Sequence, residues 1–182
     1  MRKENRIKNN SVEKILITGG ARSGKSDFAM SLANEFSRKI FLATAQPLDE
    51  EMAERIEKHR LGRGTEWRTA EEPLELVEAM QKLSSETEII VIDCITLWIT
   101  NLLMRGAGNE LVITRLDELA ETVSSFPVPL IIVTNEVGSG IVPENKLARD
   151  FRDLAGLANR KLAVACNRVV FMVAGIPMLL KE

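Results

Sequence analysis

The sequence predicts an α/β fold in which a mostly parallel central sheet carries helices on both faces. Short apolar segments rich in β-branched residues alternate with amphipathic helical segments along the chain of 182 residues. This alternation is typical of strand–helix–strand units and parallel sheets. The apolar segments are continuous rather than alternating in polarity, as expected of strands covered on both sides. A glycine-rich segment joins the first strand to the first helix, at the sheet edge where such folds bind ligands.

The individual elements follow from the spacing of apolar residues. Five buried strands are predicted, at Lys14–Thr18, Lys39–Thr44, Glu88–Asp93, Leu130–Thr134 and Val169–Ala174. Two extended segments would add edge strands, at Trp67–Thr69 and Met178–Leu180. Helices are predicted at Lys25–Phe36, Asp49–Arg60, Pro73–Leu83, Ile95–Met104, Glu110–Ser124 and Pro143–Cys166. Residues 14–182 would form one domain, and the polar residues 1–13 a flexible extension.

Composition argues against several classes of protein. The 24 basic and 26 acidic side chains nearly balance, so no overall positive field favours nucleic acid or an anionic membrane. No apolar stretch reaches the roughly 18 residues of a membrane span, and no signal-peptide pattern is present, which predicts a cytoplasmic protein without stable membrane insertion. Cys94 and Cys166 lie in apolar segments without metal-ligand spacing, so we expect reduced thiols in the core.

A complete phosphate-binding loop follows the first strand. It matches the pattern G-x₄-G-K-[ST] with Gly19, Gly20, Ala21, Arg22, Ser23, Gly24, Lys25 and Ser26. Backbone N–H groups of such a loop and of the helix start surround a di- or triphosphate. Lys25 would reach the β- and γ-phosphates, and the Ser26 hydroxyl would help to hold Mg²⁺. The alternative is a glycine-rich turn without function, but the flanking strand and helix favour nucleotide binding.

The strand that ends at Asp93 resembles the second strand of enzymes with a phosphate-binding loop. An apolar run, Ile89–Ile92, leads directly to this carboxylate. In such enzymes a carboxylate at this place holds Mg²⁺, directly or through water. Aspartate is also a good N-cap for the helix that starts near Ile95. The phosphate-binding loop favours the metal role.

The predicted helix at Asp49–Arg60 carries the only histidine of the chain. Met52, Ile56 and His59 are spaced to share one helix face, and arginines flank the histidine at positions 60 and 63. An imidazole can attack phosphorus to form a phosphoramidate, and guanidinium groups stabilise the charge that develops on phosphate oxygens. The alternative is that a histidine near a helix C-terminus only complements the helix dipole.

A polar, glycine-containing loop, Asn135–Gly140, follows the strand that ends at Thr134. Its glycines would allow closure over a substrate, or would merely turn the chain. The next predicted helix carries Arg149 and Arg152. One of these arginines would contact phosphate, or both would form ion pairs with nearby aspartates on a solvated face.

These segments, in this order, resemble the bifunctional adenosylcobinamide kinase / adenosylcobinamide-phosphate guanylyltransferase family of cobalamin biosynthesis. The resemblance extends from Ile15 to the C-terminus. It is carried by Gly19–Ser26, Phe41–Ala45, Asp49–Arg63, Trp67–Pro73, Ile92–Leu103 and Asn135–Glu144. The phosphate-binding loop is common to many families, whereas Met-Ala-x-Arg-Ile-x-x-His at residues 52–59 and Asn-Glu-Val-Gly at residues 135–138 are more specific.

The resemblance implies roles for individual residues. His59 matches the histidine that takes GMP from GTP in a guanylyl-enzyme intermediate. Further nucleotide-binding positions match Ala43, Thr44, Ala45, Arg60, Leu61, Gly62, Arg63, Glu71 and Asp93. The family also implies a RecA-like P-loop NTPase fold with three layers, and a homotrimer. The chain departs from the family pattern at Arg160, Asn167 and Arg168, which leaves the residues that contact the corrinoid open.

The activity that this resemblance implies has two steps. ATP or GTP would phosphorylate adenosylcobinamide, and GMP from GTP would then be transferred to adenosylcobinamide phosphate to give adenosylcobinamide-GDP. Two alternatives remain at this stage. One is another P-loop small-molecule kinase in which His59 is structural. The other is a RecA-like, ATP-driven module that binds nucleic acid, which the slightly acidic charge balance disfavours.

Overall fold

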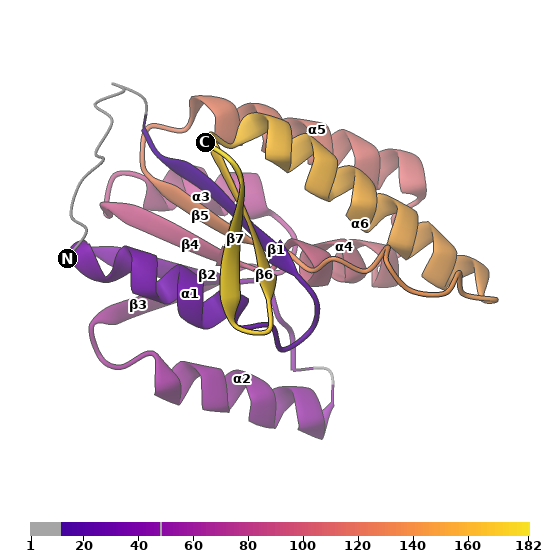
Figure 1. Cartoon of the computed structure of the whole chain (residues 1–182), viewed down its shortest axis with the longest axis horizontal. Coiled ribbons are helices and arrows are strands. Elements are labelled where there is room, and N and C mark those ends of the chain that lie inside the picture. The colour runs from indigo at the N-terminus through magenta and orange to yellow at the C-terminus, as the bar shows by residue number, and fades with distance from the viewer. Residues whose placement is uncertain (1–11, 48) are drawn as a thin grey trace.

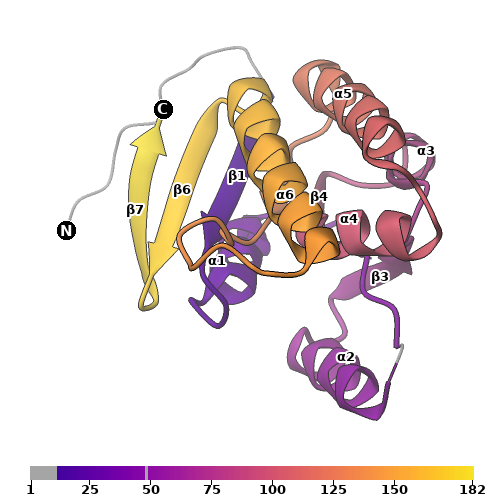
Figure 2. The same cartoon turned by 90° about the vertical axis from the view of Figure 1, so that its right-hand side faces the viewer.

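Residues 12–47 and 49–182, which the computed structural model describes, form a seven-stranded sheet between helices (Figures 1 and 2). The strands are β1 (Lys14–Gly19), β2 (Lys39–Ala43), β3 (Trp67–Glu71), β4 (Ile89–Asp93), β5 (Leu130–Val133), β6 (Arg168–Val173) and β7 (Ile176–Lys181). Their order in the sheet is β3-β2-β4-β5-β1-β6-β7. All neighbouring pairs are parallel except β6 and β7, which form an antiparallel hairpin at one edge. The predicted mostly parallel sheet is confirmed.

The helices also agree with the prediction, and their starts differ for identifiable reasons. They are α1 (Lys25–Leu32), α2 (Glu50–Gly62), α3 (Leu76–Leu83), α4 (Ile95–Met104), α5 (Asn109–Ser125) and α6 (Lys146–Ala165), with a 3-10 turn, η1 (Ala33–Glu35), after α1. α3 starts three residues later than predicted, because the Glu72 carboxylate accepts hydrogen bonds from the backbone of Leu74 and Glu75 in a turn that precedes the helix. α6 starts after Asn145, whose side chain caps it at Ala148.

The sequence also made predictions about the N-terminal residues and about membrane-spanning segments. Residues 1–11 of the predicted N-terminal extension lie outside the described residues. Within residues 12–47 and 49–182, none of the helices combines the length and apolar character needed to cross a membrane.

The apolar core has two halves, one on each face of the sheet. Successive residues of a strand point to opposite faces, so Leu16 and Ile132 pack with α3, α4, α5 and α6, whereas Ile17 and Val133 pack with α1. Helices therefore cover both faces, as predicted. α2 stands apart from the sheet, at the bottom of Figures 1 and 2, and neither apolar cluster of the described residues includes a residue of this helix.

Two fully buried threonines connect the carboxyl ends of the central strands. Thr44, after β2, donates a hydrogen bond to the carbonyl of Cys94 (2.8 Å) and accepts one from its backbone N–H (2.9 Å). Thr134, after β5, donates to the side chain of Asn159 (2.7 Å), and its backbone N–H donates to the carbonyl of Ile17 (3.0 Å). These bonds extend the strand ladders past their ends and hold neighbouring strand ends in register.

Replacing Thr44 with valine tests this contribution. Thr44→Val keeps the branched shape but removes both hydrogen bonds to Cys94, which leaves the buried N–H of Cys94 without that partner. We expect the free energy of unfolding to fall by about 1–3 kcal/mol, measured by urea denaturation. The matched control, Thr114→Val on the exposed face of α5, should change it by less than about 0.5 kcal/mol. Equal stability of the two variants would contradict the prediction.

Candidate functional site

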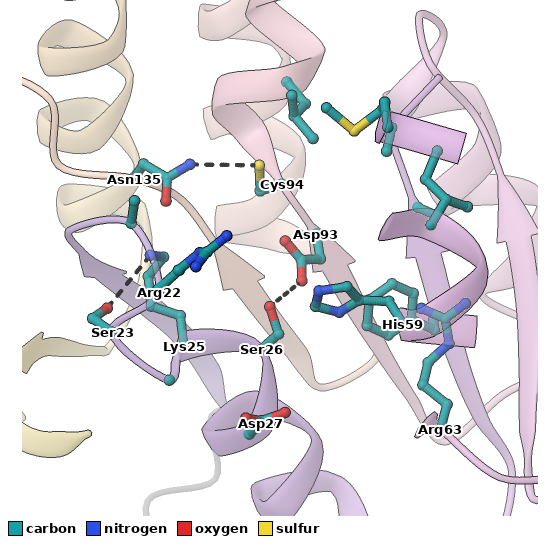
Figure 3. Close-up of a pocket in the computed structure, with 18 of the residues that line it drawn as sticks. Arg22, Ser23, Lys25, Ser26, Asp27, His59, Arg63, Asp93, Cys94 and Asn135 are labelled. Carbon is teal, nitrogen blue, oxygen red and sulfur yellow. Dashed lines mark hydrogen bonds between the residues drawn. The ribbon is translucent and has the colours of Figure 1, made fainter. Parts of the chain in front are cut away.

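The predicted nucleotide-binding segments meet in one pocket at the carboxyl edge of the sheet (Figure 3). The pocket has a volume of about 460 Å³. It lies between the loop after β1, the ends of the central strands and one face of α2. Predicted site residues that line it are Ala21, Arg22, Ser23, Gly24, Lys25, Ser26, Ala43, Ala45, His59, Arg63, Glu71 and Asp93. The other predicted nucleotide-binding residues, which flank these in the chain, are Gly19, Gly20, Thr44, Arg60, Leu61 and Gly62.

The phosphate-binding loop requires glycine at two positions for different reasons. Gly24 has a φ of 88° where α1 begins, a left-handed conformation that suits glycine. At Gly19, a Cβ atom would lie only 2.5 Å from the carbonyl oxygen of Met172 on β6. Lys25 is buried, and its Nζ donates a hydrogen bond to the carbonyl of Gly20 (2.6 Å). The loop thus turns tightly around the lysine and directs the start of α1 towards the pocket.

Asp93, the last residue of β4, lies beside the start of α1. Its carboxylate accepts a hydrogen bond from the Ser26 hydroxyl (2.5 Å). Burial raises the pKa of Asp93 above its usual value, and the Ser26 hydrogen bond together with the positive charges of His59, Lys25 and Arg63 lowers it by less. A carboxylate whose negative charge is poorly solvated attracts cations strongly.

The alternative role of Asp93 as a helix cap is wrong. The residue that precedes α4 is Cys94, and no side chain in the described part of the chain forms a capping hydrogen bond at this helix end. Asp93 is turned instead towards Ser26, where Figure 3 shows the two side chains facing each other. The two residues predicted to hold a metal are therefore brought together by the fold.

One face of α2 closes the opposite side of the pocket. Asp49 caps the helix by accepting a hydrogen bond from the backbone of Met52 (2.7 Å), which sets where the helix begins. Met52, Ile56, His59 and Arg63 all line the pocket, so the predicted shared face is confirmed. His59 is solvent-exposed in this face. Its place at the end of the helix is compatible with a dipole effect, but the imidazole also lies in the pocket.

The two arginines beside His59 differ sharply in their surroundings. Arg60 is not among the residues that line the pocket and forms an exposed ion pair with Glu57 (3.0 Å). Arg63 is only 7% exposed, and its guanidinium lies 4.1 Å from the centre of the Phe41 ring. Burial lowers the pKa of Arg63, and within the described part of the chain its Nε has no hydrogen-bond partner. Such an orphaned buried donor is unusual, and here it belongs to a pocket residue.

The two arginines of α6 that the sequence singled out bind the protein backbone. Arg149 donates to the carbonyls of Pro143 and Glu144, and Arg152 donates to the carbonyl of Gly138 (2.6 Å). Both guanidinium groups therefore hold the loop that follows β5. The sequence did not indicate this backbone-binding role, and a phosphate contact by one of the two arginines stays a prediction.

Sequence reasoning assigned no role in the pocket to five further residues that line it, namely Asp27, Phe41, Cys94, Leu97 and Asn135. A signal was present for two of them, because Cys94 and Asn135 stand immediately beyond the carboxyl ends of β4 and β5. Phe41 lies within β2, and nothing in the sequence indicates that Arg63 packs on its ring.

Cys94 and Cys166 are both buried and free, as predicted.

Comparison with known proteins finds relatives that align with nearly the whole chain. The family model described as cobinamide kinase / cobinamide phosphate guanyltransferase matches residues 15–180. The bifunctional adenosylcobalamin biosynthesis protein CobU of Escherichia coli (strain K12) is 41% identical over 179 residues, covering 92% of this chain and 99% of that protein. The bifunctional adenosylcobalamin biosynthesis protein CobP of Pseudomonas aeruginosa is 44% identical over 167 residues, covering 91% and 96%.

Solved structures share the arrangement of strands and helices. A protein of Pyrococcus horikoshii OT3 superposes with a TM-score of 0.57, covering 93% of this chain and 86% of that protein at 9% sequence identity. A prototypical ATPase from the type III secretion system of pathogenic bacteria gives a TM-score of 0.52, covering 88% of this chain and 51% of that protein at 13% identity. The fold is the three-layer, RecA-like P-loop NTPase fold that the sequence predicted.

The two cysteines should be nearly inert in the folded protein. Burial raises the pKa of Cys94 to about 11 and that of Cys166 to about 12. Because only the thiolate reacts, we expect modification by a disulfide reagent at pH 8 to be about 100-fold or more slower than in unfolded protein. The rate should rise with pH as the thiolate fraction grows. Fast modification of either thiol in the native protein at pH 8 would show that the site is open to solvent.

Proposed function

Because the chain belongs to the cobinamide kinase / cobinamide phosphate guanyltransferase family, we propose that it carries out both reactions in the pocket described above. It is a bifunctional kinase and guanylyltransferase of cobalamin biosynthesis. In the first reaction ATP or GTP phosphorylates adenosylcobinamide. In the second, GMP from GTP passes to adenosylcobinamide phosphate and gives adenosylcobinamide-GDP. The observation that carries the proposal is that the phosphate-binding loop and the face of α2 with His59 line the same pocket.

The kinase reaction uses the side of the pocket next to β1. Residues Gly19–Ser26 surround the β- and γ-phosphates with backbone N–H groups, and Lys25 neutralises their charge. The substrate hydroxyl forms a bond to the γ-phosphorus, and the bond between this phosphorus and the β,γ-bridging oxygen breaks. The nucleoside diphosphate leaves, and the hydroxyl proton passes to an oxygen of the transferred phosphoryl group.

The Asp93 carboxylate and the Ser26 hydroxyl fit a magnesium ion. Both are hard oxygen donors, and Mg²⁺ prefers such donors while it keeps waters and phosphate oxygens as further ligands. Among the described residues no group of three or more histidine, cysteine, aspartate and glutamate side chains is arranged to hold a metal, which agrees with an ion that binds together with a nucleotide. When bound, Mg²⁺ would neutralise charge on the β- and γ-phosphates.

The guanylyl transfer uses the α2 side. An imidazole nitrogen of His59 forms a bond to the α-phosphorus of GTP, and the bond to the α,β-bridging oxygen breaks, so that pyrophosphate leaves. A phosphate oxygen of adenosylcobinamide phosphate then displaces the histidine. Covalent catalysis suits this transfer because it divides one reaction between two anions into two displacements.

Arg63, whose buried Nε has no hydrogen-bond partner among the described residues, would bind a nucleotide oxygen. The remaining nucleotide contacts proposed from the family are Ala43, Thr44, Ala45, Arg60, Leu61, Gly62, Glu71 and Asp93. The Thr44 hydroxyl is bonded to Cys94, its backbone N–H donates to the carbonyl of Asp93 (3.1 Å), and its carbonyl accepts from Nδ2 of Asn101 (2.7 Å). Thr44 would therefore act mainly by holding its neighbours in place. Ala43 and Ala45 flank it and line the pocket.

His59→Ala separates the two reactions. Without the imidazole, labelling of the protein by α-labelled GTP should fall about 1000-fold or more, while transfer of the γ-phosphoryl group to adenosylcobinamide remains measurable. Lys58→Ala, an exposed neighbour in the same helical turn, should retain both activities. Mass spectrometry should find one added GMP on the His59 peptide of the wild-type protein. Retained labelling of His59→Ala would refute the nucleophile, and a wild-type protein that only phosphorylates would be another P-loop small-molecule kinase.

The proposal also includes a homotrimer and a cytoplasmic location, where ATP and GTP are available. The edge strand β7 supplies apolar surface for subunit contact, since Ile176, Met178, Leu179 and Leu180 are all at least half exposed. Sedimentation equilibrium should give three times the mass of one chain. Met178→Lys should weaken the assembly if β7 lies in the interface, and a monomeric wild-type protein would remove the trimer from the proposal.

A further inference from the structure

Asn135 lies beyond the end of β5, between the phosphate-binding loop that follows β1 and the end of β4, where Asp93 stands. It follows β5, which lies between β1 and β4 in the sheet. The next residue, Glu136, donates its backbone N–H to the carbonyl of Gly19 (3.0 Å) at the start of the phosphate-binding loop. Asn135 lines the pocket together with Lys25 and Asp93, and in Figure 3 its side chain extends into the space above them.

The amide of Asn135 is held in one orientation. Its Nδ2 donates a hydrogen bond to the Thr96 hydroxyl (2.7 Å), and the thiol sulfur of Cys94 lies 3.9 Å from the same nitrogen. Both N–H groups of the amide are therefore directed at α4. The remaining group is Oδ1, which can only accept hydrogen bonds. Figure 3 shows this oxygen turned away from Cys94 and towards the pocket.

The backbone of Asn135 is fixed as well. Its carbonyl accepts a hydrogen bond from Nδ2 of Asn159 on α6 (3.1 Å), and Oδ1 of Asn159 accepts one from the buried Thr134 hydroxyl (2.7 Å). Contacts with α4 and α6 thus position the residue from two sides. A polar atom that is held this firmly at the edge of a reaction pocket is preorganised for a ligand.

We propose that Asn135 positions the attacking hydroxyl of the acceptor in phosphoryl transfer, by accepting its hydrogen bond with Oδ1. The inference rests on the proposed function. Phosphate oxygens are themselves acceptors, so an amide oxygen has no hydrogen bond to offer them. The attacking hydroxyl is a donor and has to approach the γ-phosphoryl group beside Lys25. Asn135 does not take the proton, which passes to the transferred phosphoryl group as described above.

The proposed role of Asn135 applies to phosphoryl transfer and not to guanylyl transfer. In guanylyl transfer the attacking groups are the His59 imidazole and a phosphate oxygen, and neither needs a hydrogen-bond acceptor from the β5 side. Figure 3 places Asn135 and His59 on opposite sides of Asp93. Asn135 is therefore a positioning residue for one reaction of the two.

Asn135→Ala provides the main test. The kcat for phosphorylation of adenosylcobinamide should fall about 10- to 100-fold, the range expected when a reacting group is misplaced, with the KM for ATP within about threefold of wild type. Formation of the GMP adduct from α-labelled GTP should proceed at the wild-type rate. Thr96→Val, which removes the partner that orients the amide, should lower the same kcat by a smaller factor. Asn34→Ala in the exposed turn η1 serves as the matched control and should leave both reactions unchanged.

Several results would overturn the inference. Unchanged kinase activity in Asn135→Ala would show that the amide does not act. An equal loss of GMP adduct, an increased KM for ATP or an altered Mg²⁺ dependence would assign Asn135 to binding of the nucleotide or metal instead. Urea denaturation of each variant distinguishes these results from unfolding. A wild-type protein that forms the GMP adduct but phosphorylates no acceptor would refute the kinase half of the proposed function, and this inference with it.

Discussion

Hydrogen bonds beyond the ends of the strands are the constraint on which the site depends. In a parallel sheet the chain does not turn directly from one strand into its neighbour. No short covalent connection therefore holds the ends of neighbouring strands together at the carboxyl edge. The bonds of Thr44 to Cys94 and of the Thr134 backbone N–H to Ile17 connect neighbouring strand ends, and the Thr134 hydroxyl connects β5 to Asn159 on α6. They also fix the points from which the phosphate-binding loop, the residues after Asp93 and the loop after β5 depart. The pocket is consequently built where hydrogen bonds join the ends of the central strands.

α2 is held differently, and this affects how the nucleotide site is completed. The helix contributes nothing to the two apolar clusters among the described residues. Its inward face contacts the body of the protein through pocket residues, with the guanidinium of Arg63 packed on Phe41. The side chains that would bind a nucleotide are thus also those that locate His59. We infer that binding affinity and the placement of the nucleophile are coupled through Arg63.

The sequence was sufficient for the fold and for the phosphate side of the pocket, because both depend on local patterns. Continuous apolar strands, the spacing of the glycines and Lys25, and the carboxylate of Asp93 each occupy a few consecutive residues. The contact of Arg63 with Phe41 joins α2 to β2, and the bond between Asn135 and Thr96 joins β5 to α4. Such contacts depend on strand order and helix orientation, which no short pattern contains. Asp93 was ambiguous in the sequence for the same reason, since only the position of Ser26 decides between a helix cap and a metal ligand.

A single pocket can serve two reactions because the reactive phosphorus atoms of a triphosphate lie at different distances from the phosphate-binding loop. The loop holds the phosphates from one side, and the attacking groups approach from others. Asn135 stands on the β5 side, next to Lys25, whereas His59 stands on the α2 side (Figure 3). In the proposed mechanism, a hydroxyl acceptor aligned on the β5 side would meet the γ-phosphorus, and the imidazole would meet the α-phosphorus. The identity of the attacking group, rather than a second binding site, would then decide which bond of the triphosphate is broken.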